Sequence, residues 1–385
     1  MKRAVIVDCV RTPIGRANKE KGVFREVRSD DLAVQVVQAL VERTGIDREQ
    51  IEDVVLGNTQ QQGEQGLNAA RVVGLMAGLA THTGGTTVNR LCGSSLQAIN
   101  QASHAIMAGF EDVQIVGGLE HMQHIPMDAG IDLNPKLFTR TSKGALAMGV
   151  TAEFLAQTQG ISREEQDAFA LRSHQLAAAA QASGEFKREM LPVWGRDEHG
   201  NRILVDRDQC VRPDATMESL AALKPAFMPG LGTVTAGNSS PLNDGAAALL
   251  VMSEDKAKEL GLKPLVRVVA TAVVGVDPSV MGTGPVPATK KALKRAGLKL
   301  SDIELIELNE AFASQAIACI RMLKLDPEKI NVRGGSIAIG HPLGASGARI
   351  TTTLVNNMVD RGAQFGLATM CIGVGQGIAT IFERV

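Results

Sequence analysis

Two segments of this chain, one near its beginning and one near its end, follow the same local pattern. Residues 45–56, GIDREQIEDVVL, and residues 297–308, GLKLSDIELIEL, each start with glycine, continue with charged residues and end in an apolar run. Each segment also follows a helical pattern and enters a β-type run. The shared pattern predicts two similar halves of α/β type, with chance similarity between α/β segments as the alternative.

Two further pairs of segments are separated by nearly the same number of residues. LCGSSL at residues 91–96 stands before a helical pattern, as GHPLGA does at residues 340–345. In a weaker pair, the strand-like runs 113–116 and 365–369 both lead into a glycine-containing turn. The nearly constant spacing predicts that the cysteine and the histidine of the first pair occupy equivalent corners of the two halves.

Short β-branched runs alternate with helical patterns along the chain. Residues 3–8, RAVIVD, and residues 53–56 predict strands, whereas residues 31–43, DLAVQVVQALVER, place their apolar side chains on one helical face. The strand runs are continuously apolar, which is typical of sheets that are covered on both faces. This alternation predicts a layered α/β fold.

The repeat is interrupted by a long insertion. It starts with a Met-, His- and Pro-rich stretch, contains a helical segment at residues 162–183 and continues with a charged, irregular stretch. An excursion of this size from a duplicated core predicts a loop domain that lies over a site. We expect three units: an N-terminal half of residues 1–118 plus 244–260, the loop domain of residues 119–243, and a C-terminal half of residues 261–385.

The charge composition argues against nucleic acid as a partner. The chain has 40 basic and 41 acidic side chains, a net charge of -1 and no basic tract. Its first residues carry only four apolar side chains before Asp8, fewer than a signal peptide needs, and no run approaches the length of a membrane span. We therefore expect a cytoplasmic protein with no transmembrane segment and no nucleic-acid partner.

The five cysteines are odd in number and widely scattered, which fits neither a disulfide framework nor a paired zinc site. Cys9 ends an apolar strand and Cys319 lies in a helical run, so both are expected to be packing residues. Cys210 lies in the charged part of the insertion, where its sequence context assigns it no role. His121 and His124 form a metal-like pair without an obvious third ligand, so we expect loop packing and no metal site.

Cys92 stands between a short β-type run and a Gly-Ser-Ser step that opens a helical pattern. A thiol at the first turn of a helix is close to unsatisfied backbone N–H groups, which lower its pKa. Gly93 permits close backbone approach, and Ser94 and Ser95 can cap the helix. We expect Cys92 to form a thiolate, with a small buried cysteine as the alternative.

Three more strand or helix ends carry residues suited to chemistry. His341 lies before a helix start, where Pro342 can take an early helical position, and an inert capping histidine is the alternative. Cys371 ends a strand and is followed by glycines whose N–H groups could form an oxyanion hole. Asn309, also at a strand end, could fix a water molecule. Together with Cys92, these residues indicate covalent acyl transfer.

Four motifs in combination make the chain resemble the thiolase family over nearly its whole length. They are LCGSS at residues 91–95, NEAF at 309–312, GHPLGASGARI at 340–350 and CIGVGQG at 371–377. The resemblance implies a thiolase-like α/β fold, with two pseudo-duplicated halves in αβαβα layers and an inserted loop domain. The sequence is most similar to the thiolase subunit of the bacterial fatty-acid oxidation complex, which implies CoA-dependent cleavage of 3-ketoacyl-CoA to acetyl-CoA and an acyl-CoA two carbons shorter.

The resemblance also implies a role for each matching residue. Cys92 would be the nucleophile that becomes acylated, and His341 would deprotonate it. Asn309 would hold a water molecule, so that this water and His341 stabilise the enolate formed when the C2–C3 bond breaks. Cys371 would protonate that carbanion and later take the proton of the incoming CoA. The backbone N–H groups of Cys92 and Gly373 would receive the oxyanion during attack by CoA.

Further implications concern CoA and partner proteins. Ser240 matches the family position that contacts the pantetheine, with a turn residue as the alternative, and Phe227 would line the same tunnel. CoA would be a substrate, and no tightly bound cofactor is implied. The resemblance implies a homodimer, assembled with a hydratase/dehydrogenase α subunit as a heterotetramer.

Three other functions are compatible with part of this pattern. A biosynthetic acetoacetyl-CoA thiolase would share every motif. A condensing enzyme of the ketoacyl-synthase type also pairs a helix-start cysteine with histidine, but such sites generally use His or Asn where this chain has Cys371. A non-catalytic scaffold that binds acyl-CoA has no need for two positioned thiols.

Overall fold

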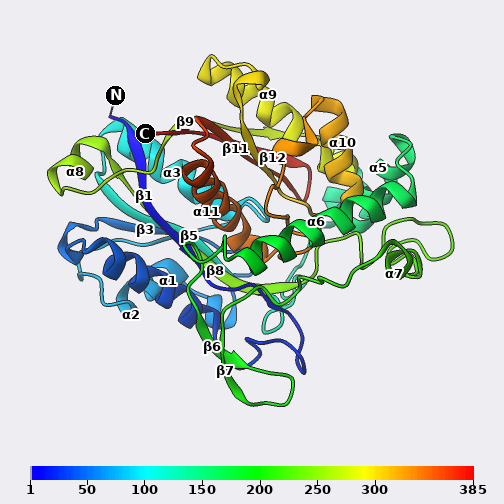
Figure 1. Ribbon diagram of the computed structural model, residues 1–385, viewed down its shortest axis with the longest axis horizontal. Helices are drawn as coiled ribbons and strands as arrows, with labels where there is room; N and C mark the ends of the chain where they lie inside the picture. The colour runs from blue at the N-terminus through cyan, green and yellow to red at the C-terminus, as the bar shows by residue number, and fades with distance from the viewer. Residues whose placement is uncertain (1) are drawn as a thin grey trace.

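The computed structural model describes residues 2–385, and most of its strands belong to one large sheet (Figure 1). The strand order is β10-β11-β12-β9-β1-β8-β5-β3-β4, and the short β2 (Gly15–Arg16) pairs with β8. The N-terminal half contributes β1 (Ala4–Arg11), β3 (Asp53–Gly57), β4 (Thr86–Val88), β5 (Val113–His121) and β8 (Asn243–Ser253). The C-terminal half contributes β9 (Val266–Gly275), β10 (Leu305–Leu308), β11 (Phe365–Ile372) and β12 (Gln376–Arg384).

The two halves share one strand arrangement. In the N-terminal half β3 is parallel to β5, and β5 is antiparallel to β8. In the C-terminal half β10 is parallel to β11, and β11 is antiparallel to β12. The edge strand β4 has a counterpart in a parallel bridge between Ile306 and Ile330. This arrangement confirms the duplication predicted from the repeated segments, and a short pairing of Val5 and Ile6 with residues of β9 joins the two half-sheets.

Helices lie on both outer faces and between the half-sheets, which gives the predicted αβαβα layers. Helices α1 (Ser29–Thr44) and α2 (Ala69–Met76) cover the N-terminal half, and α9 (Pro285–Ala296) and α10 (Ala313–Leu323) cover the C-terminal half. Helices α3 (Ser94–Ala108) and α11 (Leu343–Arg361) pack against each other and against strands of both halves. Figure 1 shows α11 near the centre of the molecule.

The two central helices approach each other closely near their N-terminal ends. A Cβ atom on Gly347 would collide with the backbone nitrogen of Leu96, so only glycine fits at this contact. Beside it, the Ala348 N–H of α11 donates to Ser95 Oγ of α3 at 2.8 Å. The loops that precede the two helices, which carry Cys92 and His341, therefore reach the same region of the molecule.

The insertion adds helices and a small hairpin to this core. Its helices are α4 (Lys143–Leu146), α5 (Met148–Thr158), α6 (Arg163–Ser183) and α7 (Met217–Ala221), and α8 (Glu254–Glu259) follows after β8. Helix α6 begins at a capping box formed by Ser162 and Glu165, close to the predicted boundary. The charged stretch predicted to be irregular instead forms an antiparallel hairpin of β6 (Val193–Arg196) and β7 (Arg202–Val205), because Val193 and Val205 are buried against the N-terminal core.

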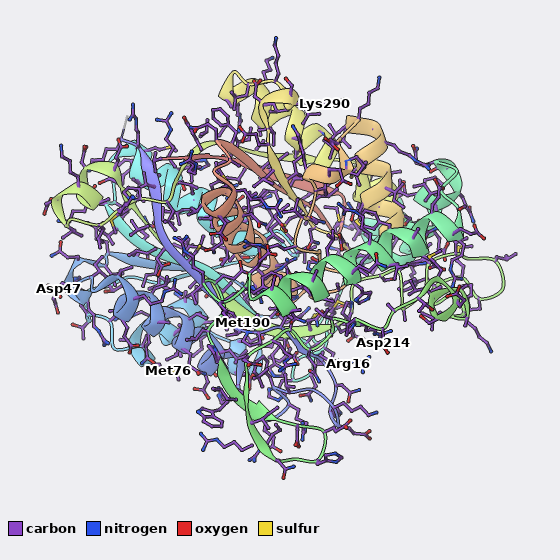
Figure 2. All side chains as sticks on the ribbon, viewed as in Figure 1. Arg16, Asp47, Met76, Met190, Asp214 and Lys290 are labelled. Atoms are coloured by element: carbon purple, nitrogen blue, oxygen red, sulfur yellow. The ribbon has the colours of Figure 1, made fainter. Side chains whose placement is uncertain are left out.

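Side chains fill the space between the layers, as Figure 2 shows. None of the helices within residues 2–385 combines the length and the apolar character that a membrane span requires.

Candidate active site

A cavity of about 670 Å³ lies where the loops before α3 and α11 meet the insertion. Six of the seven residues predicted to form the site line it: Cys92, Phe227, Ser240, His341, Cys371 and Gly373. The seventh, Asn309, is buried beside His341, with its amide nitrogen 3.4 Å from His341 Nε2. Most of the remaining lining is apolar, with Met122, Met127, Leu146, Met148, Leu242, Met281, Phe312 and Leu343 among its side chains.

The corner that carries Cys92 has an unusual backbone. Leu91 has a φ of 45°, a region that costs a residue with a branched side chain about 1 kcal/mol or more. Helix α3 begins only at Ser94, so Cys92 precedes it, and neither predicted serine cap forms. Ser94 Oγ accepts from the Arg90 N–H at 2.9 Å and donates to the Leu91 carbonyl at 2.6 Å, so it stabilises the strained corner instead.

The thiol of Cys92 is protonated in the free protein. Burial raises its pKa to about 11, although the backbone N–H groups of Gly373 and of Cys92 itself lower it. The expectation of a lowered pKa is therefore wrong for the free protein, because desolvation outweighs the two N–H groups and no cation contributes to the balance. Cys92 therefore needs a base to become a nucleophile. The same two N–H groups can donate hydrogen bonds to an oxygen that forms next to its sulfur.

His341 is held in position from both sides of its ring and from its backbone. Gly340, with a φ of 125°, reverses the chain before it, and the His341 N–H donates to Asn243 Oδ1 at 2.8 Å. Its Nδ1 lies 2.6 Å from Ser346 Oγ. Helix α11 starts at Leu343, one residue later than expected from the position of Pro342.

Burial lowers the pKa of His341 to about 3, with the positive charge of Arg349 as a second cause, so the imidazole is neutral at physiological pH. The Asn309 amide nitrogen lies 3.4 Å from His341 Nε2, and Asn309 Oδ1 accepts from Ser336 Oγ at 2.6 Å. These contacts favour the tautomer in which Nδ1–H donates to Ser346 and Nε2 carries the lone pair. His341 can therefore accept a proton at Nε2.

Cys371 is the penultimate residue of β11, and its side chain is buried. Burial raises its pKa well above the ordinary value, and the nearby Cys92 raises it further. Two protonated thiols and a neutral imidazole therefore share one largely apolar cavity. Such a site can move a proton from sulfur to nitrogen and supply a second proton from another sulfur.

The remaining predicted site residues lie toward the mouth of the cavity. Ser240 Oγ donates to the Ala311 carbonyl at 3.1 Å, and Phe227, 42% exposed, packs edge-on against Phe312 with ring centroids 5.8 Å apart. Sequence reasoning missed two cations at this mouth, Arg16 and Arg212. It also missed Ser336, Ser346 and Arg349, although the last two lie within the GHPLGASGARI motif.

The other cysteines lie outside this cavity. Cys9 and Cys319 are buried in the hydrophobic core, which confirms their predicted packing role. Cys210 Sγ accepts from Asn243 Nδ2 at 3.4 Å. None of the five cysteines, all of them within the described residues, is part of a disulfide.

His121 and His124 stack with ring centroids 3.7 Å apart and bond to Phe24, Arg25 and Glu64, as expected for loop packing. Within residues 2–385, no group of three or more His, Cys, Asp or Glu side chains is placed to hold a metal ion.

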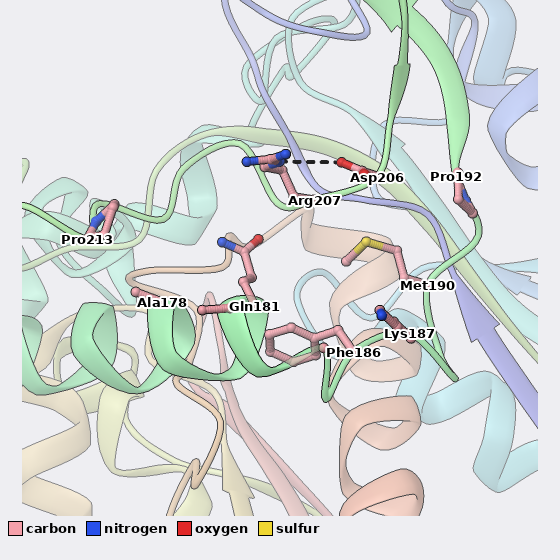
Figure 3. A pocket seen from close by; sticks show the side chains of 11 residues that line it. Ala178, Gln181, Phe186, Lys187, Met190, Pro192, Asp206, Arg207 and Pro213 are labelled. Atoms are coloured by element: carbon pink, nitrogen blue, oxygen red, sulfur yellow. Dashed lines mark hydrogen bonds and ion pairs between the residues drawn. The ribbon is translucent and has the colours of Figure 1, made fainter.

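A second cavity, of about 610 Å³, lies beside the C-terminal end of α6 (Figure 3). Phe186, Lys187 and Met190 line one part of it, and the ion pair of Asp206 and Arg207 lines another. It shares no lining residue with the cavity of Cys92.

The sequence matches two family models that together cover almost the whole chain. Residues 4–255 match the thiolase N-terminal domain, and residues 262–384 match the thiolase C-terminal domain. A 3-ketoacyl-CoA thiolase of Aliivibrio fischeri is 56% identical, and one of Photobacterium profundum is 55% identical, each over 100% of both chains. The crystal structure of the Bacillus anthracis acetyl-CoA acetyltransferase is 40% identical, with a TM-score of 0.91 over 100% of this chain and 99% of that one.

The family models, the full-length relatives and the fold agree with the motifs that line the cavity. The chain belongs to the thiolase family of acyltransferases.

Proposed function

We propose that this chain is a 3-ketoacyl-CoA thiolase, which cleaves 3-ketoacyl-CoA with CoA to acetyl-CoA and an acyl-CoA two carbons shorter, as the last step of fatty-acid β-oxidation. The observation that carries this proposal is the cavity in which Cys92, Cys371 and the neutral His341 meet. The full-length relatives named 3-ketoacyl-CoA thiolase support the choice of substrate.

In the first step His341 Nε2 takes the proton of the Cys92 thiol, and the sulfur attacks C3 of the substrate. The C2–C3 bond then breaks, and its electron pair passes to C2 as the enolate of acetyl-CoA. Asn309 holds a water molecule that stabilises this enolate together with His341. Cys371 donates its proton to C2, which releases acetyl-CoA and leaves the shortened acyl group on Cys92.

In the second step the Cys371 thiolate takes the proton of the incoming CoA. The CoA sulfur attacks the acyl-cysteine carbonyl, and the N–H groups of Cys92 and Gly373 stabilise the oxyanion. Collapse of this intermediate releases acyl-CoA, and the proton held by His341 returns to the sulfur of Cys92. Both thiols and the imidazole are then in their starting states.

CoA enters this scheme as a substrate, and thiolases are typically without a tightly bound cofactor. We propose that Ser240 and Phe227 contact the pantetheine, which fits their place along the cavity. Arg16 and Arg212 at its mouth carry the positive charge that the phosphates of CoA require. The loop domain of residues 119–243 would then provide much of the CoA site, and residues 1–118 plus 244–260 and residues 261–385 would form the two halves.

We also propose a homodimer, which joins a hydratase/dehydrogenase α subunit in a cytoplasmic heterotetramer. The dimer is supported by exposed apolar side chains of Leu67, Leu75 and Met76, close to the edge strand β4. The α subunit and the location rest on resemblance to the bacterial oxidation complex. Sedimentation of the purified chain as a monomer contradicts the dimer.

The central test combines substrate turnover with the Cys92→Ala variant. The unaltered protein, incubated with 3-ketooctanoyl-CoA and CoA, is expected to release acetyl-CoA and to carry an acyl group that intact-mass spectrometry detects. Cys92→Ala is expected to lose both the cleavage and the adduct. If the unaltered protein releases no acetyl-CoA, the proposed function is rejected. If Cys92→Ala still carries the adduct, a residue other than Cys92 is the nucleophile.

A further inference from the structure

A buried arginine lies at the start of a hydrogen-bonded chain that ends at the proposed base. Arg349 Nη2 donates to Ser336 Oγ at 2.6 Å, and Ser336 Oγ donates to Asn309 Oδ1 at 2.6 Å. The amide nitrogen of Asn309 then faces His341 Nε2 at 3.4 Å. All four side chains are buried, and they come from α11, the loop before it and the end of β10.

Arg349 differs from the other fully buried arginine of this protein. Arg11 is held by two carboxylates, since its Nε donates to Glu189 at 2.6 Å and its two terminal nitrogens donate to Asp208 at 2.7 and 3.0 Å. This geometry is typical of an arginine with a structural role. Among residues 2–385, Nε and Nη1 of Arg349 have no hydrogen-bond acceptor, and its nearest carboxylate oxygen, in Glu307, lies 4.0 Å away.

Glu307 compensates the charge of Arg349 only weakly. Burial raises the pKa of Glu307 to about 8, so this side chain is largely protonated at neutral pH. A buried guanidinium without a close carboxylate is costly, and ordinary packing does not explain its position. Its one short hydrogen bond leads toward the active site.

We propose that Arg349 is a positioning residue for the carbon–carbon cleavage step, and that it acts through Ser336 on the amide of Asn309. The guanidinium fixes the Ser336 hydroxyl so that its hydrogen points at Asn309 Oδ1. Hydrogen bonds in such a chain polarise one another, which makes the Asn309 N–H group a stronger donor. The fixed positive charge also favours negative charge on the enolate oxygen.

The inference rests on the roles proposed above for Asn309 and His341, and it separates the two halves of the reaction. The enolate exists only during cleavage of the C2–C3 bond. Transfer of an acyl group between Cys92 and CoA uses the N–H groups of Cys92 and Gly373, which lie outside the chain from Arg349. Loss of Arg349 should therefore slow cleavage much more than acyl transfer.

The test compares two reactions of the same purified dimeric or complexed enzyme. Thiolysis of 3-ketooctanoyl-CoA needs both halves, whereas exchange of isotopically labelled CoA into acetyl-CoA needs only acyl transfer. Arg349→Gln is expected to lower the kcat of thiolysis roughly tenfold to a hundredfold, less than loss of a direct oxyanion donor, with KM and exchange changed by less than about threefold. Arg349→Lys, which keeps the charge, should restore part of the rate.

Ser336→Ala breaks the same chain without removing a buried charge, so it should give the same selective loss even where Arg349→Gln folds poorly. The matched control is Arg333→Gln, which also removes a buried arginine. Arg333 pairs with Glu185 and Asp360 and makes no hydrogen bond to Ser336, Asn309 or His341. We expect this control to leave the ratio of the two rates unchanged.

Three outcomes are decisive. Equal losses of thiolysis and exchange in Ser336→Ala and Arg349→Gln, or no selective loss in either, overturn the inference. The Asn309→Ala variant serves as a reference for the proposed function. If Asn309→Ala lowers thiolysis selectively and the other two variants do not, only the role of Arg349 fails. If Asn309→Ala itself leaves the ratio unchanged, the proposed role of Asn309 fails, and the inference fails with it.

Discussion

The Ser346→Ala variant isolates the hydrogen bond that orients the proposed base. Ser346 is fully buried, and its Oγ lies 2.6 Å from His341 Nδ1. Removal of the hydroxyl leaves the Nδ1–H group without an acceptor, which costs about 1–3 kcal/mol in a buried site. The imidazole also becomes free to carry its proton on Nε2, where it can no longer accept the proton of Cys92.

If this energy is lost mainly in the transition state, kcat falls roughly tenfold to a hundredfold, since about 1.4 kcal/mol corresponds to one factor of ten. KM should change little, because the hydroxyl lies behind the imidazole and outside the cavity lining. The measurement is the initial rate of thiolysis of 3-ketooctanoyl-CoA at several CoA concentrations. The rate of Cys92 alkylation by iodoacetamide at fixed pH provides a second readout, and it should fall in parallel.

Ser103→Ala is the matched control for the loss of a buried hydroxyl group. Ser103 is also fully buried in a central helix, and its Oγ donates to the Ile99 carbonyl at 2.7 Å without contact to the cavity. It should lose some stability and keep its kcat. An unchanged kcat in Ser346→Ala, or an equal loss in both variants, refutes the assignment of His341 Nε2 as the base held by Ser346.

Two further predictions concern stability. Gly347→Val places a side chain against the backbone of Leu96, so its free energy of unfolding should fall by about 1–3 kcal/mol or more. Urea denaturation measures this loss, and an unchanged midpoint contradicts the close contact between the helices. Burial raises the pKa of Asp244 to about 7 from 3.8, so its contribution to stability is present below pH 4 and is lost as the pH rises toward 7. Asp244→Asn should therefore remove up to roughly 3 kcal/mol of the decline in stability between pH 5 and pH 8, because the decline amounts to about 1.4 kcal/mol per pH unit and ends near pH 7. Thermal unfolding at both pH values measures this, and an identical pH dependence in the variant contradicts it.

The duplicated fold could be predicted from the sequence because its signals are local. The repeated segments around Gly45 and Gly297 lie where the structure has equivalent helix-to-strand connections, and α1 and α6 begin close to their predicted positions. The hairpin of β6 and β7 was missed because its strands are short and because Trp194 and Leu204, instead of polar residues alone, lie on their exposed side and blur the alternation. Only contact with a distant part of the chain buries Val193 and Val205, and no local pattern reveals that contact.

The site was predictable as a set of residue types but not in its electrostatics. Cys92, His341 and Cys371 stand at element ends, where function is readily suspected. The pKa of Cys92 was expected to be lowered by a helix terminus, whereas burial raises it. Burial depends on the whole fold, so the sign of this shift could not follow from neighbouring residues. Arg349 was also missed, because its connection to Asn309 passes through Ser336, which lies in a different segment of the sequence.

The division of the reactive groups between the two halves of the chain has a consequence during its synthesis. The nucleophile lies in the half that is made first, while the base and the second thiol lie near the end of the chain. Until the late half has emerged and docked, the early thiol has neither the imidazole beside it nor the cavity that holds a substrate. Turnover of the substrate therefore begins only when folding is complete.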